Sequence, residues 1–328
     1  MFEQASLEDL TSFRFGHAQN DRTATGCTVI VAPGGAVCGV DVRGGGPATR
    51  ETDLLKPENM IEAVHAVVLA GGSAFGLEAS SGVMEMLSAE NIGFPVENAC
   101  VPIVVGACLF DLLVGDQDHP DKAMGRDAVR SALANKPLSQ GNVGAGTGAT
   151  VGKLLGGDRA MKSGFGMHVV RFGELVVAAL VAVNALGNVR GDDGSWIAGC
   201  RADDGSVMDG GHAFELTVQA MAAQTRAAES KGQPCANTTI GAVVTNAQLT
   251  KAQATKVSST CHDAYARAIE PVHTSNDGDT IFTFASGEVA SQVDLVAVMG
   301  TKAMERAIRS AVLFAKPAWG LPAASERS

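Results

Sequence analysis

Apolar residues follow two different patterns along the chain. Some form short unbroken runs, of which residues 175–183 are the longest, and a run of that length between turn residues is typical of a buried strand. Others recur at helical spacing: Val257, Cys261, Ala264 and Ala268 follow one another at intervals of four, three and four, which places them on one face of a helix. The chain therefore alternates between buried strands and amphipathic helices.

These patterns predict an α+β protein with sheets in the middle and helices outside, because both element types need an apolar partner. Strands are predicted at residues 66–72, 175–183, 238–245 and 280–285, and helices at residues 121–134, 213–230, 251–269 and 293–315. A further helix is predicted to follow the first of these strands, with Ser73 as its N-cap and Gly93 just past its end.

Glycines interrupt two of the predicted elements. A Pro-Gly-Gly segment at 33–35 separates the apolar segments 27–32 and 36–42, which predicts a β-hairpin. Gly76 and Gly82 lie inside the helix that follows the strand at 66, and each costs about 1 kcal/mol relative to alanine. We expect this helix to pack closely against a sheet, where a side chain would not fit.

The composition is that of a folded chain and narrows the class of protein. With 328 residues, 46% apolar and 18% charged, it fits one large sandwich or two modest domains. A net charge of -10 without any basic run argues against nucleic acid as a partner. The longest apolar run is far shorter than the roughly 20 residues that cross a membrane, so no membrane partner is expected. Seven cysteines without a C-x-x-C pair, and an N-terminus unlike a signal peptide, predict a cytoplasmic protein.

Common cofactor and hydrolase motifs are absent. Residues 141–153 end in Gly-Lys like a phosphate loop, but Leu154 stands where Ser or Thr is needed, and the position five before Gly152 is Thr147. The segment 71–76 lacks the G-x-G-x-x-G order. The histidines are scattered without an H-E-x-x-H motif, and no G-x-S-x-G elbow is present. We therefore expect no nucleotide, metal or other cofactor.

A few polar residues stand in apolar or glycine-rich surroundings. Lys153 follows the long glycine loop, Asn184 ends the apolar strand 175–183, and Asp277 and Asp279 precede another strand. Each has an ordinary alternative: a solvated charge for the lysine, a turn for the asparagine, and a loop that binds its own backbone for the aspartates.

The dipeptide Asn237-Thr238 also has two interpretations. Thr238 opens the β-branched segment 238–245, which by itself predicts an ordinary strand. If the chain breaks before Thr238, this residue carries a hydroxyl nucleophile together with a free α-amine. Such an amine titrates near ~7.7 to 8.0, so it can serve as the base at neutral pH.

Five segments in this order resemble one family along nearly the whole chain. They are residues 66–79, 120–126, 144–153, 237–240 and 272–282. Together they resemble the self-processing DmpA-type aminopeptidases, a family that includes β-peptidyl aminopeptidases and nylon-oligomer hydrolases. The Asn-Thr form of the cleavage point is most similar to the nylon-oligomer hydrolases.

This resemblance implies a four-layered αββα sandwich of the DmpA/ornithine acetyltransferase-like type that cuts itself before the nucleophile. The products would be a large fragment, residues 1–237, and a small fragment, residues 238–328, that stay packed as one unit. It further implies an N-terminal-nucleophile hydrolase that acts on small peptides or amino-acid amides, including β-peptides or 6-aminohexanoate oligomers, and that forms a homo-oligomer of cleaved pairs.

The resemblance also implies roles for the polar residues. Thr238 is the nucleophile both in self-cleavage and in catalysis. Lys153 lies near its hydroxyl, Asn184 donates its side-chain amide to the oxyanion, and Asp277 and Asp279 orient the α-amine and the lysine.

The chain departs from the family pattern at Phe110, where related enzymes carry a tyrosine before an aspartate. Without that hydroxyl, the oxyanion would depend on Asn184 and backbone donors alone, or the enzyme would bind a different acyl group. Phe110 is therefore a candidate substrate-binding residue.

Two alternatives remain beside hydrolysis. Ornithine acetyltransferase-like proteins share the self-cleaving threonine and the fold but pass the acyl group to an amine. They cleave after alanine rather than asparagine and lack the Asp277-Gly278-Asp279 segment, which favours hydrolysis. The other alternative is a noncatalytic scaffold that keeps the strand and has lost processing.

Overall fold

The computed structural model describes residues 2–226 and 237–326 of an α+β chain. Within these residues a ten-stranded mixed sheet has the order β1-β11-β12-β15-β17-β3-β5-β8-β4, and β2 pairs with β3. The pairs β15–β17 and β5–β8 are parallel, and the others are antiparallel. The strands of this sheet are β1 (Glu3–Gln4), β2 (Arg14–Asn20), β3 (Thr25–Val42), β4 (Ala48–Arg50), β5 (Val64–Ala70), β8 (Val104–Cys108), β11 (Phe165–Phe172), β12 (Leu175–Asn184), β15 (Thr238–Gln248) and β17 (Thr280–Ala290).

Shorter strands and the helices complete the described part of the chain. The short strands are β6 (Phe94–Val96), β7 (Ala99–Val101), β9 (Thr150–Val151), β10 (Met161–Lys162), β13 (Asn188–Arg190), β14 (Trp196–Ala198) and β16 (Ile269–Glu270). The α-helices are α1 (Glu78–Ala89), α2 (Lys122–Leu133), α3 (Gly210–Arg226), α4 (Lys251–Ala268) and α5 (Val293–Leu313).

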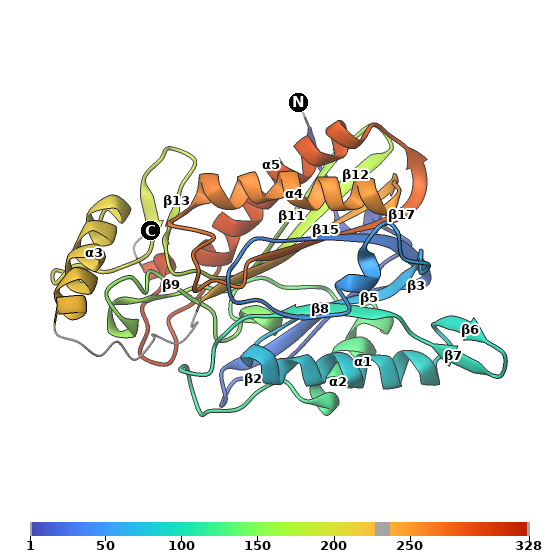
Figure 1. The fold of residues 1–328 in the computed structure, drawn as a ribbon, viewed down its shortest axis with the longest axis horizontal. Coiled ribbons are helices and arrows are strands. Elements are labelled where there is room, and N and C mark those ends of the chain that lie inside the picture. The colour runs from blue at the N-terminus through green and yellow to red at the C-terminus, as the bar shows by residue number, and fades with distance from the viewer. Residues whose placement is uncertain (1, 227–236, 327–328) are drawn as a thin grey trace.

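Helices cover the strands from two opposite sides (Figure 1). α4 and α5 lie together over β11, β12, β15 and β17, and α1 and α2 lie over β2, β5 and β8. Three apolar clusters follow from this arrangement: one under α4 and α5, one between the two halves of the sheet, and one under α1 and α2. Neighbours on β15 alternate between clusters, with Val243 in the first and Ala242 in the second, because successive strand residues face opposite ways.

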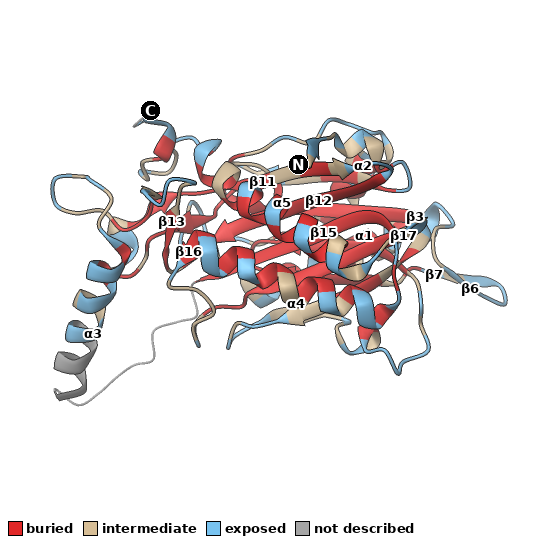
Figure 2. Cartoon of the chain, turned by 90° about the horizontal axis from the view of Figure 1, so that it is seen from above, coloured by how far each residue is buried: buried red, intermediate tan, exposed pale blue. Residues whose placement is uncertain are grey.

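The predicted strands 175–183, 238–245 and 280–285 are confirmed as β12, β15 and β17, which run slightly further. Figure 2 shows β12 and β15 as buried strands in the centre of the molecule. The predicted helices 121–134, 251–269 and 293–315 are confirmed as α2, α4 and α5. The helix predicted at 213–230 is α3, and its predicted end lies outside the described residues.

The predicted hairpin is wrong, because both of its halves belong to the single strand β3. Residues 27–31 pair with β5, whereas residues 37–42 pair with β17, so the two segments do not pair with each other. The Pro-Gly-Gly segment shifts the register between Val31 and Ala36, with Gly35 at a φ of +74°. The glycines therefore let β3 pass from one half of the sheet to the other instead of reversing it.

The helix predicted after the strand at 66 begins differently from expectation. Ser73 is not an α-helical N-cap: residues Ser73–Leu77 form a 3₁₀ helix, and α1 starts at Glu78. α1 packs against β5 and β8 as predicted, but Gly82 itself faces α2, because a Cβ there would collide with the carbonyl of Lys122. The glycine serves a close helix–helix contact.

No helix in the described part of the chain is long and apolar enough to cross a membrane.

Candidate active site

Thr238 is the first residue of β15 and is only 4% exposed. In the antiparallel pair of β12 and β15 it lies directly opposite Asn184, the last residue of β12. Opposed residues of an antiparallel pair project to the same face with Cβ atoms about 4.5–5.5 Å apart. The strand register therefore brings the side chain of Asn184 next to the proposed nucleophile.

Lys153, Thr150 and Asn184 form one hydrogen-bonded cluster. Lys153 Nζ donates to Asn184 Oδ1 at 2.8 Å and to Asn184 O at 3.0 Å. It also contacts Thr150 O at 3.0 Å and Thr150 Oγ1 at 3.1 Å. Thr150 N donates to Asn184 Oδ1 at 3.0 Å. Two nitrogen donors on this oxygen fix which end of the amide is the acceptor.

The surroundings of Lys153 change its acidity. Burial of the ammonium lowers the pKa of Lys153 from 10.5 to about 7, while the charges of Asp277 and Asp111 oppose the fall. A lysine whose pKa lies near neutrality can give up or take a proton at working pH. Lys153 is therefore not the solvated surface charge that the sequence also allowed.

The loop Asp277-Gly278-Asp279 reaches the hydroxyl of Thr238. Gly278 N donates to Thr238 Oγ1 at 3.0 Å, and the same hydroxyl contacts the carbonyl oxygen of Asn237. A Cβ on Gly278 would lie 2.8 Å from Thr238 Oγ1, so only glycine allows this approach. The hydroxyl is therefore held between a backbone amide and the peptide that precedes it.

The two aspartates of this loop are buried but have different partners. Asp277 Oδ2 accepts from Thr274 N and Thr274 Oγ1, both at 2.7 Å. Burial, with a contribution from the charge of Asp279, raises the pKa of Asp277 from 3.8 to about 6. Asp279 Oδ1 accepts from Thr239 N at 2.7 Å, and its Oδ2 accepts from His273 Nδ1 at 2.8 Å. Asp279 thus holds the backbone next to Thr238.

A three-glycine segment, residues 44–46, supports the aspartate loop and was not predicted. Gly46 N donates to Asp277 O at 2.8 Å, and Gly44 N donates to Asp279 O at 3.3 Å. A Cβ on Gly44 would collide with the backbone of Asp277. The signal in the sequence is the glycine run just after an apolar segment, but the neighbouring residues do not indicate which loop it contacts.

Phe110 lies beside the cluster through its backbone. Asn184 Nδ2 donates to Phe110 O at 2.7 Å, so one amide hydrogen of Asn184 is engaged there. A pocket of about 470 Å³ adjoins this point. Its walls include Phe110, Leu113, Thr150, Lys153, Trp319 and Leu321. The pocket gives a small ligand access to the lysine.

Lys162 is a second buried lysine that sequence reasoning missed. It is 0% exposed, and its Nζ donates to Ala149 O at 2.8 Å, to Gly146 O at 3.3 Å and to Ser163 O. Burial lowers the pKa of Lys162 to about 7, while the charge of Asp111 opposes this fall. Its ammonium thus holds the glycine loop that leads to Lys153.

Asp111, which follows Phe110, is a buried acid whose charge acts on the buried Lys162. Its carboxylate accepts from Gly72 N at 2.6 Å and from Thr25 Oγ1 at 2.8 Å. Burial raises the pKa of Asp111 to about 6, although both hydrogen bonds lower it. A lone acid in an apolar segment is the sequence signal for such a residue.

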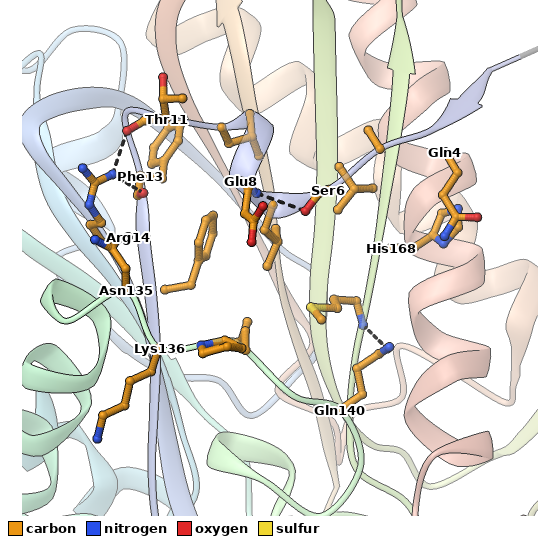
Figure 3. A pocket seen from close by; sticks show the side chains of 18 of the residues that line it. Gln4, Ser6, Glu8, Thr11, Phe13, Arg14, Asn135, Lys136, Gln140 and His168 are labelled. Atoms are coloured by element: carbon orange, nitrogen blue, oxygen red, sulfur yellow. Dashed lines mark hydrogen bonds between the residues drawn. The ribbon is translucent and has the colours of Figure 1, made fainter.

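A larger cavity, of about 820 Å³, lies elsewhere (Figure 3). It is bounded by the N-terminal segment, the residues after α2, β11 and the end of α5, and it shares no lining residue with the smaller pocket. Its labelled polar residues include Arg14, Lys136 and His168. It adjoins none of the residues predicted for the active site.

Comparisons with known proteins agree with the resemblance seen in the sequence. An uncharacterized aminopeptidase of Mycobacterium tuberculosis (strain ATCC 25618 / H37Rv) is 36% identical over 97% of this chain and 96% of its own length. A 6-aminohexanoate-oligomer endohydrolase of Agromyces sp. (strain KY5R) is 31% identical over 86% of this chain and 75% of its own length. These names support a hydrolase of the peptidase or amidase type.

A solved structure shares the fold. The L-aminopeptidase D-Ala-esterase/amidase from Ochrobactrum anthropi, described as a variant of the Ntn hydrolase fold, matches with a TM-score of 0.64 at 17% identity. The match covers 96% of this chain and 88% of that one. The profile of Peptidase family S58 matches residues 5–323. The chain therefore belongs to Peptidase family S58.

Proposed function

We propose that this protein is a self-processing amidohydrolase with Thr238 as its nucleophile. In the first step Thr238 Oγ1 bonds to the carbonyl carbon of Asn237, the bond from that carbon to Thr238 N breaks, and the hydroxyl proton passes to the nitrogen. Water then adds to the ester, which frees the hydroxyl and leaves a carboxylic acid on Asn237. Residues 1–237 and 238–328 would remain together as one four-layered αββα sandwich, since β15 lies in the middle of the sheet.

The contacts around the Thr238 hydroxyl carry this proposal. Gly278 N donates to Oγ1 at 3.0 Å, and the strand register sets Asn184 opposite Thr238. Asn184 in turn holds Lys153 Nζ at 2.8 Å. A hydroxyl held by a backbone donor, with a lysine of lowered pKa bound to the residue opposite it, suits acyl transfer to an oxygen nucleophile.

After division, the α-amine of Thr238 would act as general base toward its own hydroxyl and return the proton to the leaving amine. The carboxylate of Asp277 would orient this amine, because it adjoins Gly278, whose amide already holds Oγ1. Lys153 would stabilise negative charge on the reacting oxygen, and Asn184 would supply an oxyanion donor. Loss of one such donor typically costs about 2.7 to 4 kcal/mol of transition-state stabilisation.

The substrates we propose are small peptides or amino-acid amides, which would enter through the pocket beside Phe110 and Lys153. β-Peptides and 6-aminohexanoate oligomers belong to this class, and the names of the relatives, an aminopeptidase and a 6-aminohexanoate-oligomer endohydrolase, support it. We further propose that the protein is cytoplasmic and forms a homo-oligomer in which each subunit is a cleaved pair of the two fragments. Buried thiols such as Cys27 and Cys108 suit a reducing compartment.

Intact mass of the purified protein tests the proposal directly. Wild-type chain should yield two fragments that meet between residues 237 and 238, whereas Thr238→Ala should stay whole. Thr239→Val is a matched control that should divide normally, because the buried hydroxyl of Thr239 has no hydrogen-bond partner among the described residues. A Thr238→Ala protein that still divides there would contradict the assignment.

Activity assays separate hydrolysis from acyl transfer. The divided protein should release p-nitroaniline from amino-acid p-nitroanilides or hydrolyse β-alanyl amides. Acetyl transfer from an acetyl donor to ornithine, without amide hydrolysis, would instead support the acyltransferase alternative.

A further inference from the structure

Three ring side chains pack against one another behind the aspartate loop. His262 and Tyr265 come from α4, and His273 lies shortly before β17. The centroid of His273 is 4.7 Å from that of His262 and 5.9 Å from that of Tyr265, which stacks on it. The backbone of His273 has a φ of +58°, in the left-handed region that is uncommon for residues with a side chain. The α4 rings thus confine the imidazole although its backbone is strained.

This confined imidazole points at Asp279. His273 Nδ1 lies 2.8 Å from Asp279 Oδ2, and His273 N donates to the same oxygen at 3.1 Å. The carboxylate is only 1% exposed, so its oxygens depend on protein donors. Its other oxygen accepts from Thr239 N at 2.7 Å. That amide belongs to the peptide bond that follows Thr238, so the histidine reaches the nucleophile through one carboxylate.

The two nitrogens of the imidazole differ in what they do. Nδ1 binds Asp279, whereas Nε2 is buried and has no hydrogen-bond partner among the described residues. An asparagine side chain can place an amide N–H close to the position of Nδ1, and asparagine also tolerates a positive φ. The hydrogen bond can therefore be kept while the rest of the ring is removed.

We propose that His273 is a positioning residue for Thr238. It holds the Asp279 carboxylate, and this carboxylate fixes the peptide bond between Thr238 and Thr239. The inference rests on the proposed function, because it assigns an orientation to that nucleophile. His273 acts through Asp279 and does not line the substrate pocket. Its loss should therefore lower turnover and leave substrate affinity almost unchanged.

The test compares His273→Asn with His273→Leu in the full chain. Leucine fills similar space without a donor, and asparagine restores the donor. The fraction of uncleaved chain is followed by mass spectrometry after synthesis. We then measure kcat and KM on the cleaved protein. The thermal unfolding midpoints of both variants are compared. We expect His273→Leu to divide at least tenfold more slowly and to lose kcat with KM within about twofold. His273→Asn should stay within about threefold of wild type.

Several results would overturn the inference. One is division of His273→Leu at the wild-type rate. Another is an equal loss in both variants, since that would assign the effect to ring packing. If His273→Leu fails to fold, a tenfold loss in a folded His273→Asn protein refutes the role, and near-normal rates in that variant support it. A wild-type chain that neither divides nor hydrolyses amides would defeat the proposed function itself, and the inference with it.

Discussion

Replacing Lys162 by methionine should remove a pH-dependent part of the stability of this protein. Lys162 is 0% exposed, and burial lowers its pKa from 10.5 to about 7. Between these two values the folded lysine is mostly neutral, whereas the unfolded lysine is mostly charged. The unfolded state therefore binds more protons, and the free energy of unfolding rises with pH across this window.

The size of the effect follows from the two pKa values. One unit of pKa difference corresponds to about 1.4 kcal/mol, and the lysine is already half neutral at pH 7 when folded. Integration from pH 7 to pH 9 gives a gain of about 2 kcal/mol from Lys162. Lys153, whose pKa is also lowered to about 7, adds its own gain in this window to both the wild type and the variant. Asp111 and Asp277, whose pKa values are raised to about 6, titrate in a lower window and contribute little here. The methionine variant should lack only the part of the gain that comes from Lys162.

The assay is urea unfolding at pH 7 and pH 9, in a Thr238→Ala background that keeps one chain. Trp319 provides the fluorescence signal, since its ring centroid lies 5.7 Å from Lys162 Nζ. Lys56→Met is the control. The side-chain hydrogen bond to Asp53 raises the pKa of exposed Lys56, so this lysine stays charged in both states and its loss should add no pH dependence. A wild-type minus Lys162→Met difference that stays equal at both pH values, or shrinks at pH 9, would refute the reasoning.

Three further changes test other parts of the structure. Gly278→Ala should slow division at least tenfold in a mass time course, since its Cβ would lie 2.8 Å from Thr238 Oγ1; an unchanged rate would contradict the proposed contact. Because the pKa of Asp277 is raised to about 6, kcat should rise with pH through about 6 as the carboxylate ionises, and Asp277→Asn should remove this step while leaving the rise that belongs to the α-amine. Gly82→Ala should lower the free energy of unfolding by about 1 to 3 kcal/mol, because its Cβ would collide with Lys122 O. Equal urea midpoints would rule that clash out.

Elements that depend on local chemistry could be predicted from the sequence. The β-branched run at 238–245 and the apolar run at 175–183 are strands because they fill two faces of a buried sheet. α4 begins at Lys251 as predicted, where Thr250 and Gln253 form a capping box. The hairpin prediction at residues 33–35 fails because turn residues suit either a reversal or a shift of register. Only the choice of partner strands decides between them.

The residues of the candidate site also fall into those that the sequence indicates and those that it does not. The sequence proposes Thr238, Lys153, Asn184, Asp277 and Asp279 because each stands out against its surroundings, and all but Asn184 lie in a segment that resembles the family. The residues that hold these five in place cannot be identified from the sequence, because their hydrogen-bond partners lie far away in the chain. The glycine segment 44–46 binds the loop at 274–279, and the Lys162 ammonium binds carbonyls at 146, 149 and 163. Such pairings follow from the order of strands, which no local pattern encodes.

The departure at Phe110 affects the pocket more than the hydrogen-bonded cluster. Asn184 Nδ2 donates to the backbone oxygen of Phe110, an acceptor that any residue at this position supplies. The phenyl ring is therefore not needed to orient the amide, and its contribution is to the pocket that also includes Leu113, Trp319 and Leu321. A tyrosine hydroxyl would place a donor in that wall, whereas phenylalanine leaves it apolar. Under the proposed function, the missing hydroxyl would bear on which acyl group the pocket accepts, whereas the Asn184 amide would be oriented for self-cleavage by the backbone oxygen of Phe110 alone.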